Sequence, residues 1–302
     1  MAKIVVTGIN GFVGYHLSKL LFERGNEVIG IGIETQLNAN LAPFVSEYIV
    51  TDLVDSFPHL PDVDGIIHLA GFSAVGPSYD HPQRYINGNT AMLTNMAEFY
   101  VSQGKKPRMV VISSGAIYDG NQPMPITEDS ALGFTSPYAV SKVAVEDQAK
   151  YYNQRGLNIV IARPFNHIGP GQGKGFLLPD LVGRIEELPE DQHEIIVGNL
   201  ATSRDYTDVR DIVRAYVMLL EKKDTQHLIY NVSSNVNVKG TEILQKILEI
   251  KDRSDVTYRI DQSLVRATDI MKIQGSHERL TAETGWQPEY SVDTTISDFI
   301  NY

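Results

Sequence analysis

The sequence contains no cysteine, and this absence excludes a disulfide, a thiolate metal site and a thiol nucleophile. Basic residues are also few, because 26 Lys and Arg stand against 37 Asp and Glu, which gives a net charge of −11. A nucleic-acid-binding surface normally has a basic footprint, so we expect no nucleic-acid partner. A local arginine cluster for a phosphorylated ligand remains compatible with this charge. The lack of cysteine fits a cytoplasmic protein.

Long hydrophobic runs are missing as well. No apolar stretch approaches the roughly 20 residues that a membrane span requires, so we expect no membrane partner. The opening MAKIVVTG begins a predicted strand at once, which favours the absence of a signal peptide. The 302 residues are 42% hydrophobic and 21% charged, a composition typical of a globular protein with one large α/β domain or two domains.

The first half of the chain alternates predicted strands with predicted helices. Residues 3–7 (KIVVT) form a continuous apolar run, which is typical of a parallel strand buried on both faces. Further strands are expected at EVIGIGI (27–33), YIVTDL (48–53), GIIHLAG (65–71), RMVVISS (108–114) and LNIVIARP (157–164). This alternation predicts an α/β fold with a doubly wound, Rossmann-type parallel sheet.

Three glycines, Gly8, Gly11 and Gly14, lie between the first strand and its helix. Glycines at this point permit a tight turn and the close approach of a diphosphate to the helix N-terminus. Their spacing differs from the G-x-G-x-x-G fingerprint, so a turn without a ligand stays open. Glu34 follows the second strand, where an acidic residue would hold an adenosine ribose. No Lys or Arg occurs in residues 25–83, which disfavours a 2′-phosphate, so NAD or NADP is expected with a preference for NAD.

SPYAVSK (136–142) predicts the start of a second informative helix. Ser136 is a good N-cap, Pro137 suits the first helical position, and Gly156 can end the helix. Tyr138 and Lys142 are then neighbours on one face, four positions apart. A surface i,i+4 pair without a function is the alternative interpretation.

These features and several others give the chain a resemblance to the extended short-chain dehydrogenase/reductases, the NAD-dependent epimerase/dehydratase family. The matching motifs are the glycine turn, the Tyr-x-x-x-Lys pair, VVISSGAIYDG (110–120), TDL (51–53), HLAG (68–71), Asn87, RPFNHIGPG (163–171), SRDYTDVRD (203–211) and ETGWQP (283–288). They cover essentially the whole chain in the family's order.

The resemblance implies that Ser114, Tyr138 and Lys142 form the catalytic set. A free tyrosine has a pKa of about 10, and a nearby ammonium together with an oxidised nicotinamide is expected to lower it. Tyr138 would then exchange a proton with the substrate oxygen, and Ser114 would hydrogen-bond that oxygen. Lys142 would also bind the nicotinamide ribose. Ser113 and Ser114 could otherwise be ordinary strand-end hydroxyls.

The resemblance also implies a binding role for further residues. The expected cofactor-binding residues are Gly8, Asn10, Gly11, Phe12, Val13, Gly14, Glu34, Asp52, Leu53, Leu69, Ala70, Gly71, Asn87, Tyr138, Lys142 and Phe165. The expected substrate-binding residues are Ser73, Ser114, Asn166, Arg204 and Arg266. Guanidinium groups suit a diphosphate because they make charge-assisted contacts to phosphate oxygens. Arg204 could instead pair with Asp205 or Asp208, and Arg266 could be a solvated surface charge. The eight histidines lack zinc-site spacing, so no metal is expected.

The predicted organisation has two parts. Residues 1–165 are expected to form the dinucleotide-binding domain, with 206–232 returning to it, and 166–205 with 233–302 would form the nucleotide-sugar-binding lobe. We expect RDYTDVRDIVRAYVMLLEK (204–222) to return to the sheet as a helix and HLIYNV (227–232) to be another strand. The resemblance implies a homodimer formed through helices that start near Asn87 and Pro137.

The resemblance narrows the reaction as well. Dehydratases of the family carry an acidic pair directly after the catalytic Ser or Thr, where this chain has Gly115 and Ala116. FNHIGPGQGKGF (165–176), VGNLATSRDYTDVRDIVRAY (197–216) and GSHERLTAETGWQP (275–288) look most like bacterial GDP-4-keto-6-deoxy-D-mannose reductases, which make GDP-D-rhamnose. The alternatives are a nucleotide-sugar 4-epimerase with tightly bound NAD, a dTDP-4-keto-6-deoxy-hexose reductase, and a dinucleotide-sensing binding protein. The intact catalytic set speaks against the last of these.

Overall fold

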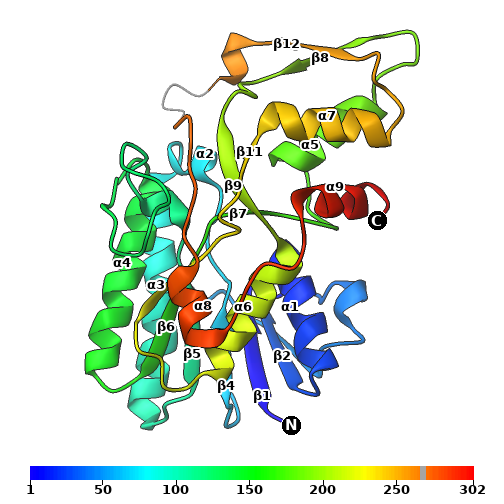
Figure 1. Cartoon of the computed structure of the whole chain (residues 1–302). Coiled ribbons are helices and arrows are strands. Elements are labelled where there is room, and N and C mark those ends of the chain that lie inside the picture. The colour runs from blue at the N-terminus through cyan, green and yellow to red at the C-terminus, as the bar shows by residue number, and fades with distance from the viewer. Residues whose placement is uncertain (266–269) are drawn as a thin grey trace.

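A parallel seven-stranded sheet forms the centre of the molecule, with the strand order β3–β2–β1–β4–β5–β6–β10 (Figure 1). The strands are β1 (Lys3–Thr7), β2 (Glu27–Gly32), β3 (Glu47–Val50), β4 (Gly65–His68), β5 (Arg108–Ile112), β6 (Asn158–Pro164) and β10 (Ile229–Val232). The order reverses between β1 and β4, the point at which open α/β sheets bind ligands. The predicted doubly wound α/β fold is confirmed. This computed structural model describes residues 1–265 and 270–302.

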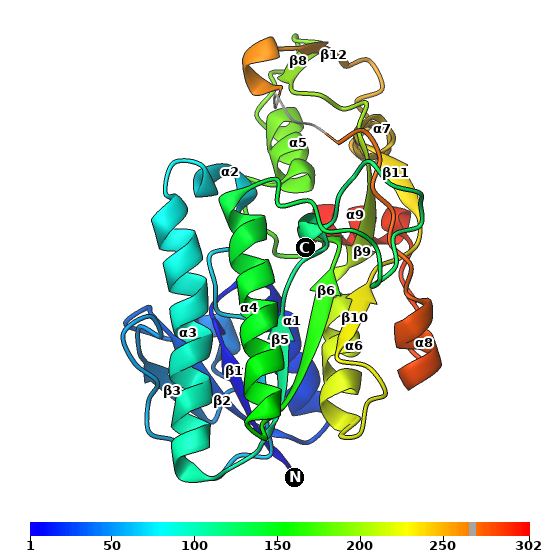
Figure 2. The same ribbon diagram turned by 90° about the vertical axis from the view of Figure 1, so that its left-hand side faces the viewer.

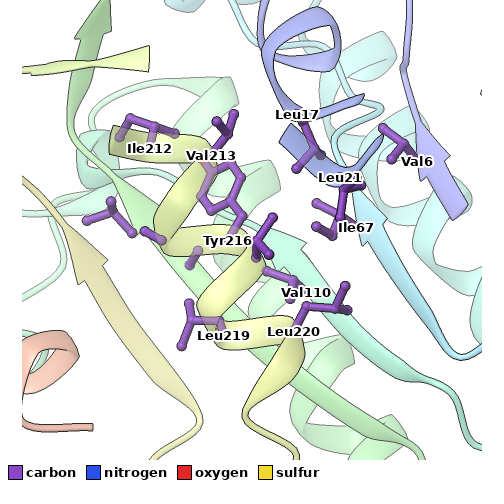
Figure 3. Packing of buried hydrophobic residues seen from close by; sticks show 14 of the residues in the cluster. Val6, Leu17, Leu21, Ile67, Val110, Ile212, Val213, Tyr216, Leu219 and Leu220 are labelled. Carbon is purple, nitrogen blue, oxygen red and sulfur yellow. The ribbon is translucent and has the colours of Figure 1, made fainter. Parts of the chain in front are cut away.

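Helices cover both faces of the sheet (Figure 2). On one face lie α1 (Phe12–Glu23) and α6 (Val209–Glu221), and on the other α3 (Pro82–Gln103) and α4 (Pro137–Gln154). Side chains of α1 and α6 interdigitate with Val6, Ile67 and Val110 of the sheet (Figure 3). Alternate residues of the same strands, such as Val5 and Ile66, pack against α3 and α4. The continuous apolar runs in the sequence are therefore explained by burial on two faces.

The helix boundaries follow local sequence signals with one difference from the prediction. Ser136 accepts a hydrogen bond from the Ala139 amide (3.1 Å), so it caps α4 as expected. The other long helix, α3, begins at Pro82 and ends at Gly104, whose φ is +65°. It therefore starts one turn before Asn87, because Pro82 occupies a first-turn position that needs no amide donor.

A smaller lobe packs beyond the carboxyl ends of the main strands (Figure 1). It contains a sheet of β7 (Asn166–Ile168), β9 (Ser203–Asp208) and β11 (Asn237–Lys239), and a pair of strands, β8 (Glu194–Val197) and β12 (Thr257–Ile260). Its helices are α5 (Leu177–Glu186), α7 (Gly240–Ile250) and α9 (Val292–Ile300), which enclose a separate apolar core. Short elements elsewhere are α2 (Val75–Ser78), α8 (Glu278–Thr284), and the 3-10 turns η1 (Ala39–Leu41), η2 (Gly115–Ile117) and η3 (Gln262–Leu264).

The stretch 204–222 is not one helix, so that part of the prediction is wrong. Its first residues belong to β9, and α6 begins only at Val209, because the Asp208 side chain accepts the Arg210 amide (2.7 Å) as an N-cap. The predicted strand at 227–232 is present as β10, which pairs with β6 at the edge of the main sheet. The proposed division into a dinucleotide-binding domain and a lobe stays a prediction. No helix of the described residues is long and apolar enough to cross a membrane.

Candidate active site

The glycine turn connects β1 to α1 at the carboxyl edge of the sheet. Gly8 has a φ of +67°, and a Cβ there would lie 2.8 Å from the Ala70 amide nitrogen. A Cβ on Gly14 would lie 2.1 Å from the Ile9 carbonyl oxygen, so α1 packs directly against the turn. Gly11 is the N-cap and supplies no side-chain cap. The first-turn amides of α1 thus have no side-chain partner at a point that lines a cleft, which suits an anionic ligand.

The end of β2 places a carboxylate beside this turn. Glu34 lines the cleft, and its Oε2 accepts a hydrogen bond from Asn10 Nδ2 (3.1 Å). Tyr48 donates its hydroxyl to the Glu34 carbonyl (2.7 Å), and it also contacts Asn10. Asn10 further holds the backbone of Asn38, so it braces the loop and is not among the residues that line the cleft.

The candidate catalytic residues meet where β5 and α4 approach one another. Tyr138 is 6% exposed, and its phenol is close enough to Ser114, which follows β5, for that hydroxyl to influence its pKa. Lys142 is 7% exposed, lies 5.9 Å from the centroid of the Tyr138 ring, and donates to the Ile112 carbonyl (2.8 Å). Ser114 also accepts the Ala116 amide (3.1 Å), which orients its side chain. All three side chains line the same cleft as the glycine turn.

The electrostatics of Tyr138 differ from the sequence-based expectation. Burial raises the pKa of the Tyr138 phenol above its usual value, and the neighbouring Ser114 side chain opposes that rise only in part. Burial also lowers the pKa of the Lys142 ammonium to about 8. In the protein alone, desolvation of the phenolate therefore dominates the pKa of Tyr138. The lowering expected from Lys142 together with an oxidised nicotinamide stays a prediction.

A cleft of about 1900 Å³ is lined both by the main sheet with its helices and by the smaller lobe. Drug-sized ligands occupy sites of about 300–1000 Å³, so there is room for two ligands side by side. The predicted site residues that line it are Gly8, Gly11, Phe12, Val13, Gly14, Glu34, Asp52, Leu53, Leu69, Ala70, Gly71, Ser73, Asn87, Ser114, Tyr138, Lys142, Phe165, Asn166 and Arg204. Asn10 lies outside the lining, and Arg266 lies outside the described residues.

Arg204 lies on β9 and donates to the Ser203 carbonyl (3.0 Å). The two carboxylates that could have paired with it bond elsewhere. Asp205 accepts from Ser234 and from the amides of Asn235 and Gly275. Asp208 binds Arg210 (2.6 Å). Arg204 itself lines the cleft.

Sequence reasoning missed several polar side chains of the cleft. They are Gln83, Arg84, Gln172, Asp180, Arg184, Asn199 and Thr202. Arg84 had a visible signal, since it is the first basic residue after the long stretch without Lys or Arg. Its guanidinium lies 4.6 Å from the centroid of the Phe72 ring. The others follow no fixed spacing, because the lobe assembles them from separate segments. No group of three or more metal-ligating side chains occurs among the described residues.

A dinucleotide-type sheet with a Ser, Tyr and Lys set in its cleft defines a class of nicotinamide-dependent enzymes. The model of the family described as GDP-mannose 4,6 dehydratase matches residues 5–299, so the chain belongs to this family, which is of the NAD-dependent epimerase/dehydratase type. It is thus an enzyme of the nucleotide-sugar short-chain dehydrogenase/reductase group. The predicted family is confirmed.

Individual relatives support this assignment. The chain is 30% identical over 300 residues to a GDP-6-deoxy-D-mannose reductase of Pseudomonas aeruginosa, covering 97% of this chain and 94% of the relative. It is 26% identical to a bifunctional UDP-glucose 4-epimerase and UDP-xylose 4-epimerase of Arabidopsis thaliana, covering 99% and 95%. Among solved structures, RMD from Pseudomonas aeruginosa complexed with NADPH has a TM-score of 0.82 at 29% identity, covering 100% of this chain and 98% of that one. A putative epimerase from Burkholderia cenocepacia J2315 has a TM-score of 0.86 at 28% identity, covering 99% and 97%.

Proposed function

We propose that the chain reduces the C4 keto group of a nucleotide-linked 4-keto-6-deoxy sugar with NAD(P)H. The substrate we infer is GDP-4-keto-6-deoxy-D-mannose, and the product is GDP-D-rhamnose. The observation that carries this proposal is the buried Tyr138 phenol, which lines the cleft beside Ser114 and has Lys142 one helical turn away. A phenol in this position can give a proton to a ketone oxygen that binds between it and Ser114.

The protein residues would act on the substrate oxygen. Ser114 would hydrogen-bond the C4 carbonyl oxygen and orient it, and Tyr138 would donate a proton as negative charge develops there. When bound, the reduced nicotinamide supplies the hydride to C4, so that the C=O bond becomes a C–H and an O–H bond. Lys142, one turn further along α4, would stabilise the phenolate left on Tyr138 and bind the nicotinamide ribose.

The turn at Gly8–Gly14 fits the diphosphate of a dinucleotide. The uncapped first turn of α1 offers backbone donors, and added side chains on Gly8 or Gly14 would collide with backbone atoms. Glu34 would hold the adenosine ribose hydroxyls. Its carboxylate would repel a 2′-phosphate, and this favours NADH over NADPH. NADPH is the alternative cofactor, because RMD from Pseudomonas aeruginosa, which has a similar structure, is complexed with NADPH.

Dehydration is disfavoured at the turn after Ser114. Gly115 has no side chain, and a Cβ there would lie 3.0 Å from two carbon atoms of the Phe165 ring. A carboxylate side chain therefore does not fit, and the methyl group of Ala116 can neither give nor take a proton. An acid–base pair for removal of a C5 proton and expulsion of the C6 hydroxyl is missing at these two positions.

A reductase and an epimerase would use the same catalytic set, so this set does not decide between the two reactions. We therefore base the choice between them on the similar proteins. The 30% match to GDP-6-deoxy-D-mannose reductase favours reduction and a guanine nucleotide. A 4-epimerase with tightly bound NAD is the second candidate, because relatives at 26% identity carry that activity in their names. Reduction of a dTDP-linked 4-keto-6-deoxy-hexose is a variant of the first proposal, with the same reaction and a different nucleotide. A dinucleotide-sensing protein would have no use for the complete set of Ser114, Tyr138 and Lys142.

Absorbance of added NADH or NADPH would be followed with GDP-4-keto-6-deoxy-D-mannose and with its dTDP-glucose-derived counterpart. Stoichiometric oxidation with one pair would establish the reductase, and it would fix the cofactor and the nucleotide together. An absence of oxidation, combined with NAD⁺ retained in the purified protein, would contradict the reductase and favour the epimerase. Purified protein that exchanges its cofactor freely is the expected result.

A further inference from the structure

A buried carboxylate continues the line of catalytic residues along α4. Tyr138, Lys142 and Glu146 follow one another at intervals of four positions, so they lie on the same face of the helix. Glu146 is 1% exposed and does not line the cleft. A carboxylate that is almost fully buried requires compensating partners. Its partners therefore indicate why it is present behind the candidate active site.

Glu146 is held from two strands of the main sheet. The Ser113 hydroxyl, at the end of β5, donates to its Oε1 (2.5 Å). Arg163 of β6 donates through Nε to the same oxygen (2.8 Å) and through Nη2 to Oε2 (2.6 Å). The side chains of both ion-pair partners are 4% exposed or less. This is a bidentate pair in a dry environment, where its geometry is strongly fixed.

The two strands that Glu146 joins both lead directly into the cleft. Ser113 precedes Ser114, and Arg163 lies just before Phe165 and Asn166, which line the cleft. A single carboxylate therefore ties the β5 end, the β6 end and α4 together. Loss of its contacts would release the Ser114 backbone relative to the Tyr138 helix.

The charge of Glu146 also acts on Lys142. Burial lowers the pKa of the Lys142 ammonium to about 8, and the Glu146 carboxylate opposes this loss. The other titratable groups around Lys142 are Tyr138, whose pKa is raised by burial, and His68, whose pKa burial lowers to about 3. Both are therefore uncharged near neutral pH. Arg163 pairs with Glu146 and neutralises part of the carboxylate charge.

We propose that Glu146 is a positioning residue that fixes the β5 end beside α4 and places a buried negative charge one helical turn from Lys142. The proposal rests on the proposed function for the catalytic use of Lys142. The charge of Lys142 itself can be measured without substrate or cofactor. The two proposals can therefore fail separately.

The test compares Glu146→Gln with two control variants. Glu146→Gln keeps the size of the side chain and removes its charge. Arg163→Met removes the opposite charge of the same pair, and Ser113→Ala removes one hydrogen bond and no charge. Competitive acetylation of the whole chain with acetic anhydride across a pH series, read at Lys142 by mass spectrometry, gives the midpoint of its deprotonation. The pH dependence of kcat gives the second measurement.

We expect the Lys142 midpoint near pH 8 in the wild type and at least about one pH unit lower in Glu146→Gln. Ser113→Ala should leave the midpoint unchanged, and Arg163→Met should not lower it. In Glu146→Gln, the fall of kcat at alkaline pH should shift to lower pH together with the Lys142 deprotonation midpoint. The KM for the nucleotide sugar should change little. Should Glu146→Gln fail to fold, the double variant Glu146→Gln/Arg163→Met removes the pair without leaving a lone buried charge. An unmoved midpoint in the folded variant, or an equal loss of activity at every pH, would overturn the proposal.

Discussion

Tyr138 is buried in a way that suits donation of a proton better than removal of one. Its pKa is raised by desolvation, so the phenol keeps its proton near neutral pH until a base develops nearby. The growing alkoxide at C4 of a reduced ketone is such a base. Oxidation of a sugar hydroxyl needs the phenolate, which a positive charge close to Tyr138 would stabilise. The raised pKa of Tyr138 therefore fits the proton-donating role that we propose for it.

Replacement of Tyr138 by Phe removes the proton and leaves the ring. We expect turnover of the 4-keto substrate to fall by about 10²–10⁴-fold, while dinucleotide affinity stays within a few-fold. Tyr85→Phe is a matched control, because its ring centroid lies 6.4 Å from that of Tyr138 and it does not line the cleft. Steady-state kinetics and a dinucleotide titration measure the two effects. Full activity in Tyr138→Phe would remove this residue from the catalytic set.

The strand and helix elements were predictable wherever one local signal decided them. The continuous apolar run of β1 and the Ser136 cap of α4 each predict an element that the structure contains. The start of α6 was missed because β9 (SRDYTD) has Tyr206 as its single apolar residue and so gives no strand-like alternation, and the Asp208 cap was taken as part of the helix. Asn10 could not be placed, since its partners come from distant segments: Tyr48 lies in β3 and Asn38 precedes the turn η1.

The glycine turn permits a prediction that separates binding from folding. Gly11 has an ordinary φ of −76°, and a Cβ there would lie 3.2 Å from the Gly8 carbonyl oxygen, a tight but tolerable contact. Gly11→Val should therefore lower dinucleotide affinity at least about tenfold, because its side chain enters the cleft at the diphosphate position. Its melting temperature should change by only a few degrees.

Gly14→Ala is the contrasting variant at the same turn. Its Cβ would lie 2.1 Å from the Ile9 carbonyl oxygen, so α1 must shift away from β1. We expect a loss of stability on the order of 1–3 kcal/mol, in line with other overpacked sites. Thermal unfolding and dinucleotide titration of both variants test the pair. Normal dinucleotide affinity in Gly11→Val would contradict the role of the turn.

At the scale of the whole molecule, the cleft brings together basic side chains from distant segments of an acidic chain. The chain carries a net charge of −11, yet Arg84, Arg184 and Arg204 all line this one cleft. Arg84 comes from α3 of the main body, whereas Arg184 and Arg204 come from α5 and β9 of the lobe. Glu34, Asp52 and Asp180 line the same cleft, so we expect the three arginines to favour a nucleotide diphosphate only where they lie together. Sequence spacing could not reveal this grouping, because it depends on how the lobe closes over the sheet.

Arg204→Ala tests whether the lobe binds the nucleotide sugar. A charge-assisted hydrogen bond to phosphate contributes about 1.5–3 kcal/mol, so the nucleotide-sugar KM should rise by about 10- to 100-fold. The kcat and the dinucleotide affinity should stay nearly constant, since Tyr138 and the glycine turn are untouched. Arg259→Ala is the control: Arg259 lies on β12 of the same lobe, pairs with Glu194 (3.3 Å) and does not line the cleft. An unchanged KM in Arg204→Ala would remove Arg204 from the substrate site, and an equal rise in both variants would indicate a general disturbance of the lobe.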